Sequence, residues 1–103
     1  MTGPAFYDWP AVNGEIAAGI TRKEIAGKGA ALKQVTIPGG TEAGRHDHSF
    51  EQFIQVISGG GVLHCAAGEV KLRPGTVVHL PAGSWHSAVF ESDTVLLEIN
   101  LAD

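Results

Sequence analysis

The sequence has little cysteine and little positive charge, and each shortage removes a class of function. Cys65 is the only cysteine among 103 residues, so an intrachain disulfide and a metal site built from several thiolates are both excluded. The 7 Lys and Arg are outnumbered by 11 Asp and Glu, which gives a formal net charge of -4. Because no basic surface results, we expect no nucleic-acid partner. The lone thiol fits a reducing compartment.

Long hydrophobic runs are also missing. No segment approaches the run of about 18 apolar residues that a membrane-spanning helix needs, so we expect no membrane partner. The N-terminal stretch M-T-G-P-A-F-Y-D-W-P has neither the charged start nor the apolar run of a secretory signal, which predicts a cytoplasmic protein. With 44% hydrophobic and 17% charged residues, the chain has the composition of a globular protein. Its length predicts one domain over residues 1–103.

Short apolar segments separated by glycine and proline make up most of the chain. They are rich in β-branched residues, and turns recur about every 8 to 12 residues, a spacing typical of a sandwich or barrel. The segments are 30–37, 53–57, 62–66, 70–72, 76–80, 85–90 and 94–99. Glycines break the only candidate for a long helix, at 11–20, although one helical turn fits 8–13. The sequence therefore predicts an all-β domain.

Several of these segments are apolar on both faces. Gln52, Ile54 and Val56 share one side of a strand, whereas Phe53 and Ile57 share the other. A small barrel buries only its inner face unaided, so the outer residues need cover from the N-terminal segment or from a second subunit. We expect a homodimer, which is the simpler arrangement.

Two histidines, His46 and His48, stand one residue apart in R-H-D-H-S-F-E-Q (45–52). On an extended segment such side chains point the same way and both can reach one metal ion. The spacing alone is a weak indication, since two solvated loop histidines would look the same.

The two histidines belong to a longer pattern. Residues 40–59 read G-x5-H-x-H-x3-Q-x6-G, and residues 75–86 read G-x5-P-x-G-x2-H. This pattern resembles the two motifs of the cupin superfamily, G-x5-H-x-H-x3-E-x6-G and G-x5-P-x-G-x2-H-x3-N. The resemblance implies a single-domain cupin jelly-roll β-barrel (a double-stranded β-helix) with a divalent metal inside. Carried over by position, the metal ligands are His46, His48, Gln52 and His86.

Two positions depart from the motifs. Phe90 replaces an asparagine that is usually not a ligand, and Gln52 replaces the glutamate. A neutral amide leaves the +2 charge of the ion uncompensated, so we expect weaker metal binding, a stronger Lewis acid and attraction of an anionic substrate. Glu51 is the rival ligand, although on a regular strand it points away from the site. Alternatively, Gln52 only forms hydrogen bonds beside a three-histidine metal. The ligands suit Zn, Ni, Fe, Mn or Co alike.

Glu98 is the candidate catalytic residue. From the pattern of its strand, it is either a solvated surface carboxylate or a general acid or base beside the metal. The chain also resembles, more weakly, small cupins that process unsaturated monouronates from pectin and alginate breakdown, and Glu98 matches the carboxylate on their final strand. That resemblance implies a catalytic role for Glu98. The aromatic residue and the arginine that those proteins carry beyond the strand have no counterpart in residues 100–103.

Two histidines, His64 and His79, lie outside the motifs. On strand parity His64 faces outward, and His79 either lines the cavity or is a satisfied core or interface histidine. We expect the cavity to be partly apolar, with a lining of Ile54, Val56, Leu63, Ala88 and Phe90.

The predicted function follows from the ligand set together with Glu98. It is a metal-dependent isomerase or lyase acting on a small anionic, sugar-acid-like substrate, with Glu98 moving a proton. An iron-dependent dioxygenase is one alternative. A non-catalytic module that binds a sugar or small acid is another.

Overall fold

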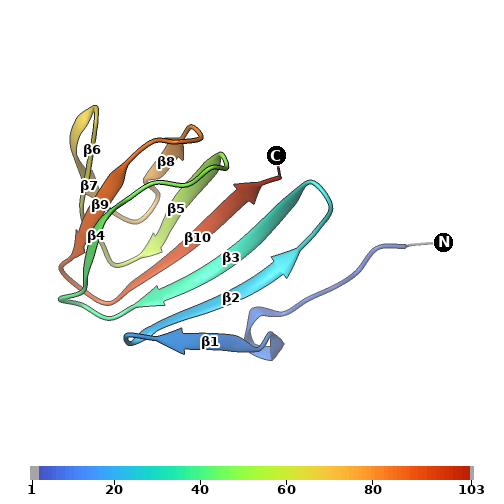
Figure 1. Ribbon diagram of the computed structural model, residues 1–103. Helices are drawn as coiled ribbons and strands as arrows, with labels where there is room; N and C mark the ends of the chain where they lie inside the picture. The colour runs from blue at the N-terminus through green and yellow to red at the C-terminus, as the bar shows by residue number, and fades with distance from the viewer. Residues whose placement is uncertain (1–2, 103) are drawn as a thin grey trace.

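Ten strands and one short 3-10 helix make up the fold of residues 3–102, which are the residues that the computed structural model describes (Figure 1). In chain order they are η1 (Trp9–Ala11), β1 (Gly14–Ala17), β2 (Ile20–Ala26), β3 (Ala30–Ile37), β4 (Glu42–His46), β5 (Gln52–Ser58), β6 (Gly61–Cys65), β7 (Gly68–Leu72), β8 (Val77–Leu80), β9 (His86–Phe90) and β10 (Thr94–Leu101). Residues 3–102 contain no α-helix, and no helix there is long and apolar enough to cross a membrane. The all-β prediction is confirmed.

The strands form two antiparallel sheets that face each other (Figure 1). The larger sheet has the order β1-β2-β3-β10-β5-β8, and the smaller has the order β4-β9-β6-β7. Some neighbouring strands are distant in sequence, as where the last strand, β10, lies between β3 and β5. This is the jelly-roll arrangement that the motif resemblance implied.

The core lies between the sheets and follows the two-residue alternation of each strand. In β5 the side chains of Gln52, Ile54 and Val56 are buried, whereas Phe53 and Ile57 face outward, as the sequence predicts. The buried apolar residues are Val35, Ile37, Ile54, Val56, Leu63, Leu72, Leu80, Ala88, Phe90 and Leu96. Each large one contributes about 1.5 to 3 kcal/mol of hydrophobic stabilisation.

Every segment that the sequence predicts to be extended contributes a strand, and the helical turn predicted at 8–13 is η1. The sequence reading missed β1, β2 and β4. The first two form a hairpin at the edge of the larger sheet, with no fully buried residue, so the apolar pattern that marks the other strands is absent. β4 has the sequence E-A-G-R-H and also contains no fully buried residue, so it too lacks the apolar pattern.

The glycines of the two motifs lie at turns where the backbone has a positive φ. The φ angles are 87° at Gly40, 78° at Gly59, 92° at Gly75 and 80° at Gly83. Residues with a Cβ adopt this region at a cost of about 1 kcal/mol or more. Half of the motif pattern therefore specifies the turns of the fold, and the other half supplies the site.

The N-terminal segment does not cover the outer face of the larger sheet. Phe6 and Tyr7 are 90% and 60% exposed, and the segment runs away from the sheets (Figure 1). Ile57 and Val77 on the outer side of that sheet are 50% and 61% exposed. Cover by a second subunit, and hence the homodimer, stays a prediction.

Candidate metal centre

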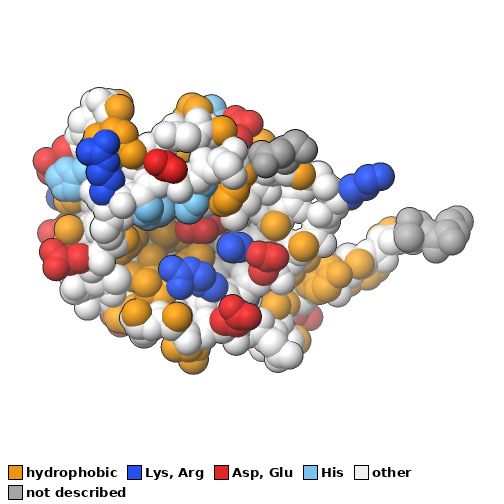
Figure 2. Space-filling view, viewed as in Figure 1, with side chains coloured by type: hydrophobic (Ala, Val, Ile, Leu, Met, Phe, Trp, Pro, Cys, Tyr) orange, Lys and Arg blue, Asp and Glu red, His pale blue; other side chains and the backbone are white. Residues whose placement is uncertain are grey.

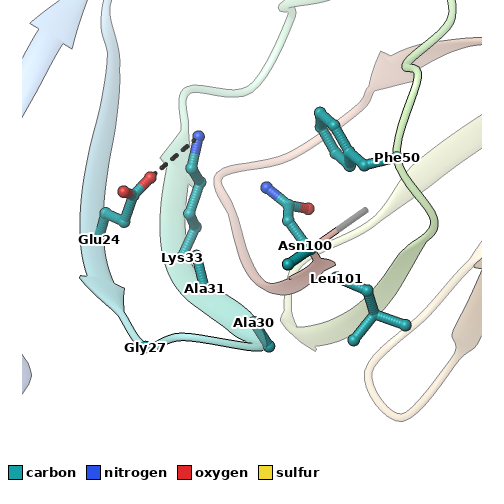
Figure 3. Close-up of a pocket in the computed structure, with 9 residues that line it drawn as sticks. Glu24, Gly27, Ala30, Ala31, Lys33, Phe50, Asn100 and Leu101 are labelled. Carbon is teal, nitrogen blue, oxygen red and sulfur yellow. Dashed lines mark ion pairs between the residues drawn. The ribbon is translucent and has the colours of Figure 1, made fainter.

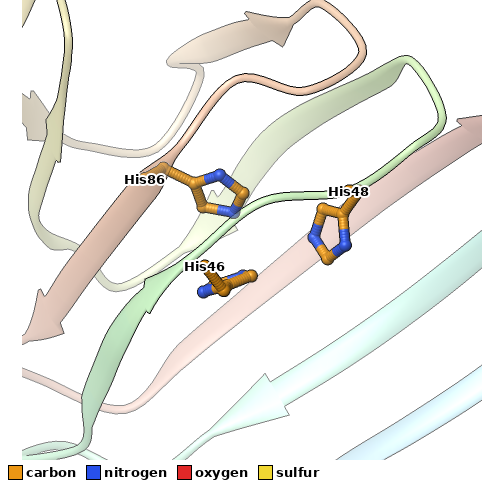
Figure 4. Close-up of side chains that lie close together, drawn as sticks. All are labelled: His46, His48 and His86. Atoms are coloured by element: carbon orange, nitrogen blue, oxygen red, sulfur yellow. The ribbon is translucent and has the colours of Figure 1, made fainter.

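Three histidines converge between the two sheets (Figure 4). His46 ends β4, His48 lies two residues later in the loop to β5, and His86 begins β9. His46 and His86 are brought together because they are register partners across the antiparallel pair of β4 and β9. One ring nitrogen from each histidine lies within 4.8 Å of those of the other two. This spacing fits simultaneous contact with one ion, because metal to imidazole nitrogen bonds are about 2 Å long.

The local environment favours the ligand form of the imidazoles. The Nδ1 atom of His46 is 2.8 Å from the carbonyl oxygen of Gly44, which holds the proton on Nδ1 and leaves Nε2 free for a metal. Burial, followed by the nearby His46, lowers the pKa of both His48 and His86. Both rings are therefore neutral near pH 7, as metal binding requires. The ring of Phe50 stacks on His48 at 4.7 Å between centroids and supports its orientation.

Gln52 begins β5, is only 3% exposed and lines the same pocket as the histidines. Its Nε2 atom donates to Oδ1 of Asn100 at 2.8 Å and, at the longer distance of 3.4 Å, to Oε1 of Glu98. Within residues 3–102, the Oε1 atom of Gln52 and the Nδ1 atom of His86 are buried with no hydrogen-bond partner. Such orphaned atoms cost about 1 to 3 kcal/mol each. An oxygen or an unprotonated ring nitrogen that coordinates a cation gains a partner, and this cost is then removed. The residues present therefore fit a divalent metal.

Glu98 lies inside the molecule, in the middle of β10. Its register partners are Lys33 on β3 and Ile54 on β5, and its side chain lines the cavity that the histidines border. Burial raises the pKa of the Glu98 carboxyl, although the cations Lys33 and Arg22 oppose the shift. Of the two orientations open from the sequence, the cavity-facing one is therefore observed.

The cavity has two adjacent parts that share four lining residues. The polar pocket, of about 150 Å³, is lined by all three histidines, Gln52, Glu98 and Arg22, among others. The apolar chamber, of about 100 Å³, shares Arg22, His46, His86 and Glu98 with it, and its other lining side chains are all apolar. Figure 2 shows this hollow, with histidine on one side, Lys and Arg on the other, and hydrophobic side chains at its floor. Four of the five predicted lining residues are in the chamber wall, whereas Val56 is buried in the core and does not reach the wall.

A third recess, which we call the vestibule, borders the polar pocket on the outside (Figure 3). It has a volume of about 330 Å³ and shares Lys33, Phe50 and Asn100 with the polar pocket. At its wall the Lys33 ammonium lies 3.4 Å from the carboxylate of Glu24. The vestibule and the polar pocket therefore share part of their walls.

Two residues considered for the site lie outside it. Glu51, the rival ligand, interacts with His79 on the outer surface, so it does not face the histidine cluster. His79 itself is exposed and stacks on Phe53 at 4.6 Å, so of the alternatives open from the sequence neither the cavity-lining position nor the core position is observed. In β8 the alternation turns Val78 and Leu80 inward and His79 outward. His64 is exposed, as predicted.

The sequence reading missed two cations that line the polar pocket, Arg22 on β2 and Lys33 on β3. For Lys33 a signal was available, since Val35 and Ile37 on the same strand face are buried. For Arg22 there was little signal, because its strand was not identified and its inward side chain is polar.

The comparisons with known proteins agree with this fold. A profile of the cupin domain matches residues 33–100. A RmlC-like cupin from Shewanella frigidimarina is 17% identical, with a TM-score of 0.88 over 98% of this chain and 93% of that one. KdgF from Halomonas sp. is 20% identical, with a TM-score of 0.85 over 98% and 96%. Ectoine synthase from P. lautus is 17% identical, with a TM-score of 0.78 over 85% and 67%.

At these identities the solved structures support the fold alone. No protein of curated function matches the chain. The family match spans well over half of the sequence and includes the three histidines, Gln52 and Glu98. We conclude that the chain belongs to the cupin domain family.

Proposed function

We propose that the protein is a metal-dependent isomerase or lyase that acts on a small anionic substrate of the sugar-acid type. The observation that carries the proposal is the half-buried carboxylate of Glu98 in the same cavity as the three-histidine cluster. Proton transfer next to a carbonyl group requires a residue beside the cation site that can both accept and donate a proton.

His46, His48 and His86 would hold the ion, with Oε1 of Gln52 as the fourth ligand atom. A divalent ion bound there would supply a Lewis acid that polarises a carbonyl or hydroxyl oxygen of the substrate. The unpartnered, buried Oε1 of Gln52 supports its assignment as a ligand, because its Nε2 is already committed to Asn100. Since imidazole and amide ligands are neutral, they leave the positive charge of the site for an anionic guest.

Glu98 would move the proton. Its pKa is raised by burial, which brings it closer to neutral pH, where a carboxyl group is most effective as an acid or base. The Gln52 amide at 3.4 Å and the cations Arg22 and Lys33 border the same pocket and restrict the position of the carboxylate. An anionic substrate is supported by those two cations.

Replacing Glu98 with glutamine should reduce turnover by about 10²- to 10⁴-fold while leaving metal content unchanged, because the amide keeps the shape but cannot carry the proton. The measurement is product formation by zinc-loaded wild type and variant on the best substrate from a panel of uronates and 2-hydroxy acids. Glu51→Gln is the matched control, since that carboxylate lies on the outer surface. Full activity of Glu98→Gln beside full activity of the control would rule out proton transfer by Glu98.

An iron-dependent dioxygenase is the second candidate, and the three-histidine cluster favours it because such a set leaves coordination positions open on iron. If this candidate is correct, the iron-loaded protein consumes oxygen in the presence of its substrate and the zinc-loaded protein does not. Equal turnover with zinc and iron and no oxygen uptake would leave the isomerase or lyase.

A further inference from the structure

The cavity beside the histidine cluster has two chemically different ends. The polar pocket is lined by the histidines, Gln52 and the two cations, whereas the apolar chamber lies next to it, against the core, and shares four of its lining residues. The apolar wall of the chamber includes Ile20, Val35, Leu63, Ala88, Phe90 and Leu96. A guest that occupies both parts must therefore have one polar and one apolar end.

The size of the chamber limits the apolar end. An apolar protein cavity of about 150 Å³ accommodates benzene, so a chamber of about 100 Å³ takes a group of about three or four carbons. A hydroxyl group placed there would lose its hydrogen bonds to water without gaining a partner from the apolar wall. The chamber therefore discriminates against a fully hydroxylated chain at this end of the guest.

Arg22 is placed to bind the other end. It borders both the polar pocket and the chamber, so its guanidinium can reach a guest that spans the two. Lys33 is already paired with Glu24, and Glu15 is the register partner of Arg22 on β1. Within residues 3–102, however, Arg22 forms no ion pair, with Glu15 or with any other carboxylate. A guanidinium free of a protein partner suits bidentate binding of a carboxylate.

We infer that the substrate of the site is a small amphipathic carboxylate whose charged group binds Arg22 and whose unhydroxylated end, of about three or four carbons, fills the apolar chamber. This inference rests on the proposed function, because it takes the anion bound in the cavity to be the substrate. It keeps the anionic substrate and replaces the sugar-acid type proposed above with a carboxylate whose other end carries no hydroxyl groups.

Binding of simple acids tests the inference without any need for turnover. The probes are acetate, butanoate, 3-methylbutanoate, its neutral amide and galacturonate, titrated by calorimetry into zinc-loaded and chelator-treated protein. We expect affinity to rise about fourfold for each carbon that enters the chamber. The branched acid should bind more tightly than galacturonate, and the neutral amide should bind least.

Two kinds of variant separate the two ends. Arg22→Gln should weaken 3-methylbutanoate about 10- to 100-fold and leave the amide unchanged, because a charge-assisted hydrogen bond is lost. Ala88→Leu should abolish the gain from the branched tail and leave acetate binding intact, because the added side chain fills the chamber. Ala43→Leu, at a partly buried position of the same wall, serves if Ala88→Leu does not fold. Arg73→Gln is the matched control, since Arg73 is exposed and lines none of the three recesses.

Three results would overturn the inference: galacturonate binding as tightly as the branched acid, no effect of Arg22→Gln, or no dependence on tail length. None of these results concerns the metal site, so the proposed function would stand. The proposed function fails on different results, namely no metal bound by wild type or full activity of Glu98→Gln. Tail-dependent binding to chelator-treated protein would still support the cavity assignment in that case.

Discussion

Replacing His86 with alanine is expected to lower the affinity for Zn²⁺ or Ni²⁺ by more than about a hundredfold, so that the purified protein carries almost no metal. Even residues that only orient a metal ligand are worth about 10- to 100-fold in affinity, and removing a ligand costs more. His86 is 5% exposed and faces His46 across two paired strands, so no other side chain is positioned to substitute for it. The measurement is metal content by mass spectrometry after dialysis, followed by competition with a chromophoric chelator.

Two further variants test whether the loss of metal is specific to the proposed ligands. His64→Ala removes an exposed histidine from β6 and should leave metal content unchanged. Gln52→Leu should reduce affinity by about tenfold, a smaller loss than for His86→Ala, because an amide oxygen is the weaker ligand. Equal and negligible metal in wild type, His86→Ala and His64→Ala would contradict the metal site and leave only the fold.

Gly59→Ala is expected to prevent stable folding. A Cβ at this position would overlap the carbonyl oxygen of Asp93 and lie 2.6 Å from the side-chain oxygen of Thr94. Neither can move easily, because Thr94 is fully buried and its hydroxyl accepts a hydrogen bond from the amide of Gly60 at 3.0 Å. The positive φ of 78° adds about 1 to 2 kcal/mol of backbone strain. A small domain has only about 5 to 15 kcal/mol of total stability.

Two other glycines separate overlap from strain in this experiment. Gly75 has a φ of 92° with open space around it, so Gly75→Ala should cost only the strain of about 1 to 2 kcal/mol. Gly44 has neither a positive φ nor a neighbour within 4 Å, so Gly44→Ala should be near neutral. The measurement is the free energy of unfolding in urea. A loss for Gly59→Ala no larger than that for Gly75→Ala would show that the close approach at Gly59 is unimportant.

The sequence was sufficient for the parts of the fold that follow a strict pattern. Strand alternation put Gln52, Ile54 and Val56 on the inner face, and two fixed-spacing segments indicated both the jelly roll and the cluster of histidines. The spacing also selected Gln52 over Glu51 as the residue that lines the pocket, and the structure agrees with that choice. The inner face of the strand follows from local geometry that the chain itself encodes, whereas the jelly roll and the ligand positions are what the resemblance to the cupin motifs implies.

The rest depends on contacts between strands that are distant in sequence. Whether Glu98 faces solvent or the cavity is decided by its pairing with β3 and β5, which periodicity does not specify. The inward side of β2 carries Arg22, a polar residue at a position where pattern reasoning expects an apolar one. The position of His79 stayed open because a histidine is compatible with either face of a strand.

The site residues come from two different sheets, so the two parts of the site can change independently during evolution. His46 and His86 belong to the smaller sheet, whereas Arg22, Lys33 and Glu98 belong to the larger one. Substitutions on β2, β3 and β10 can therefore change the guest and the reaction while the histidines that would hold the ion stay untouched. One scaffold can in this way change its chemistry while the three-histidine cluster is kept.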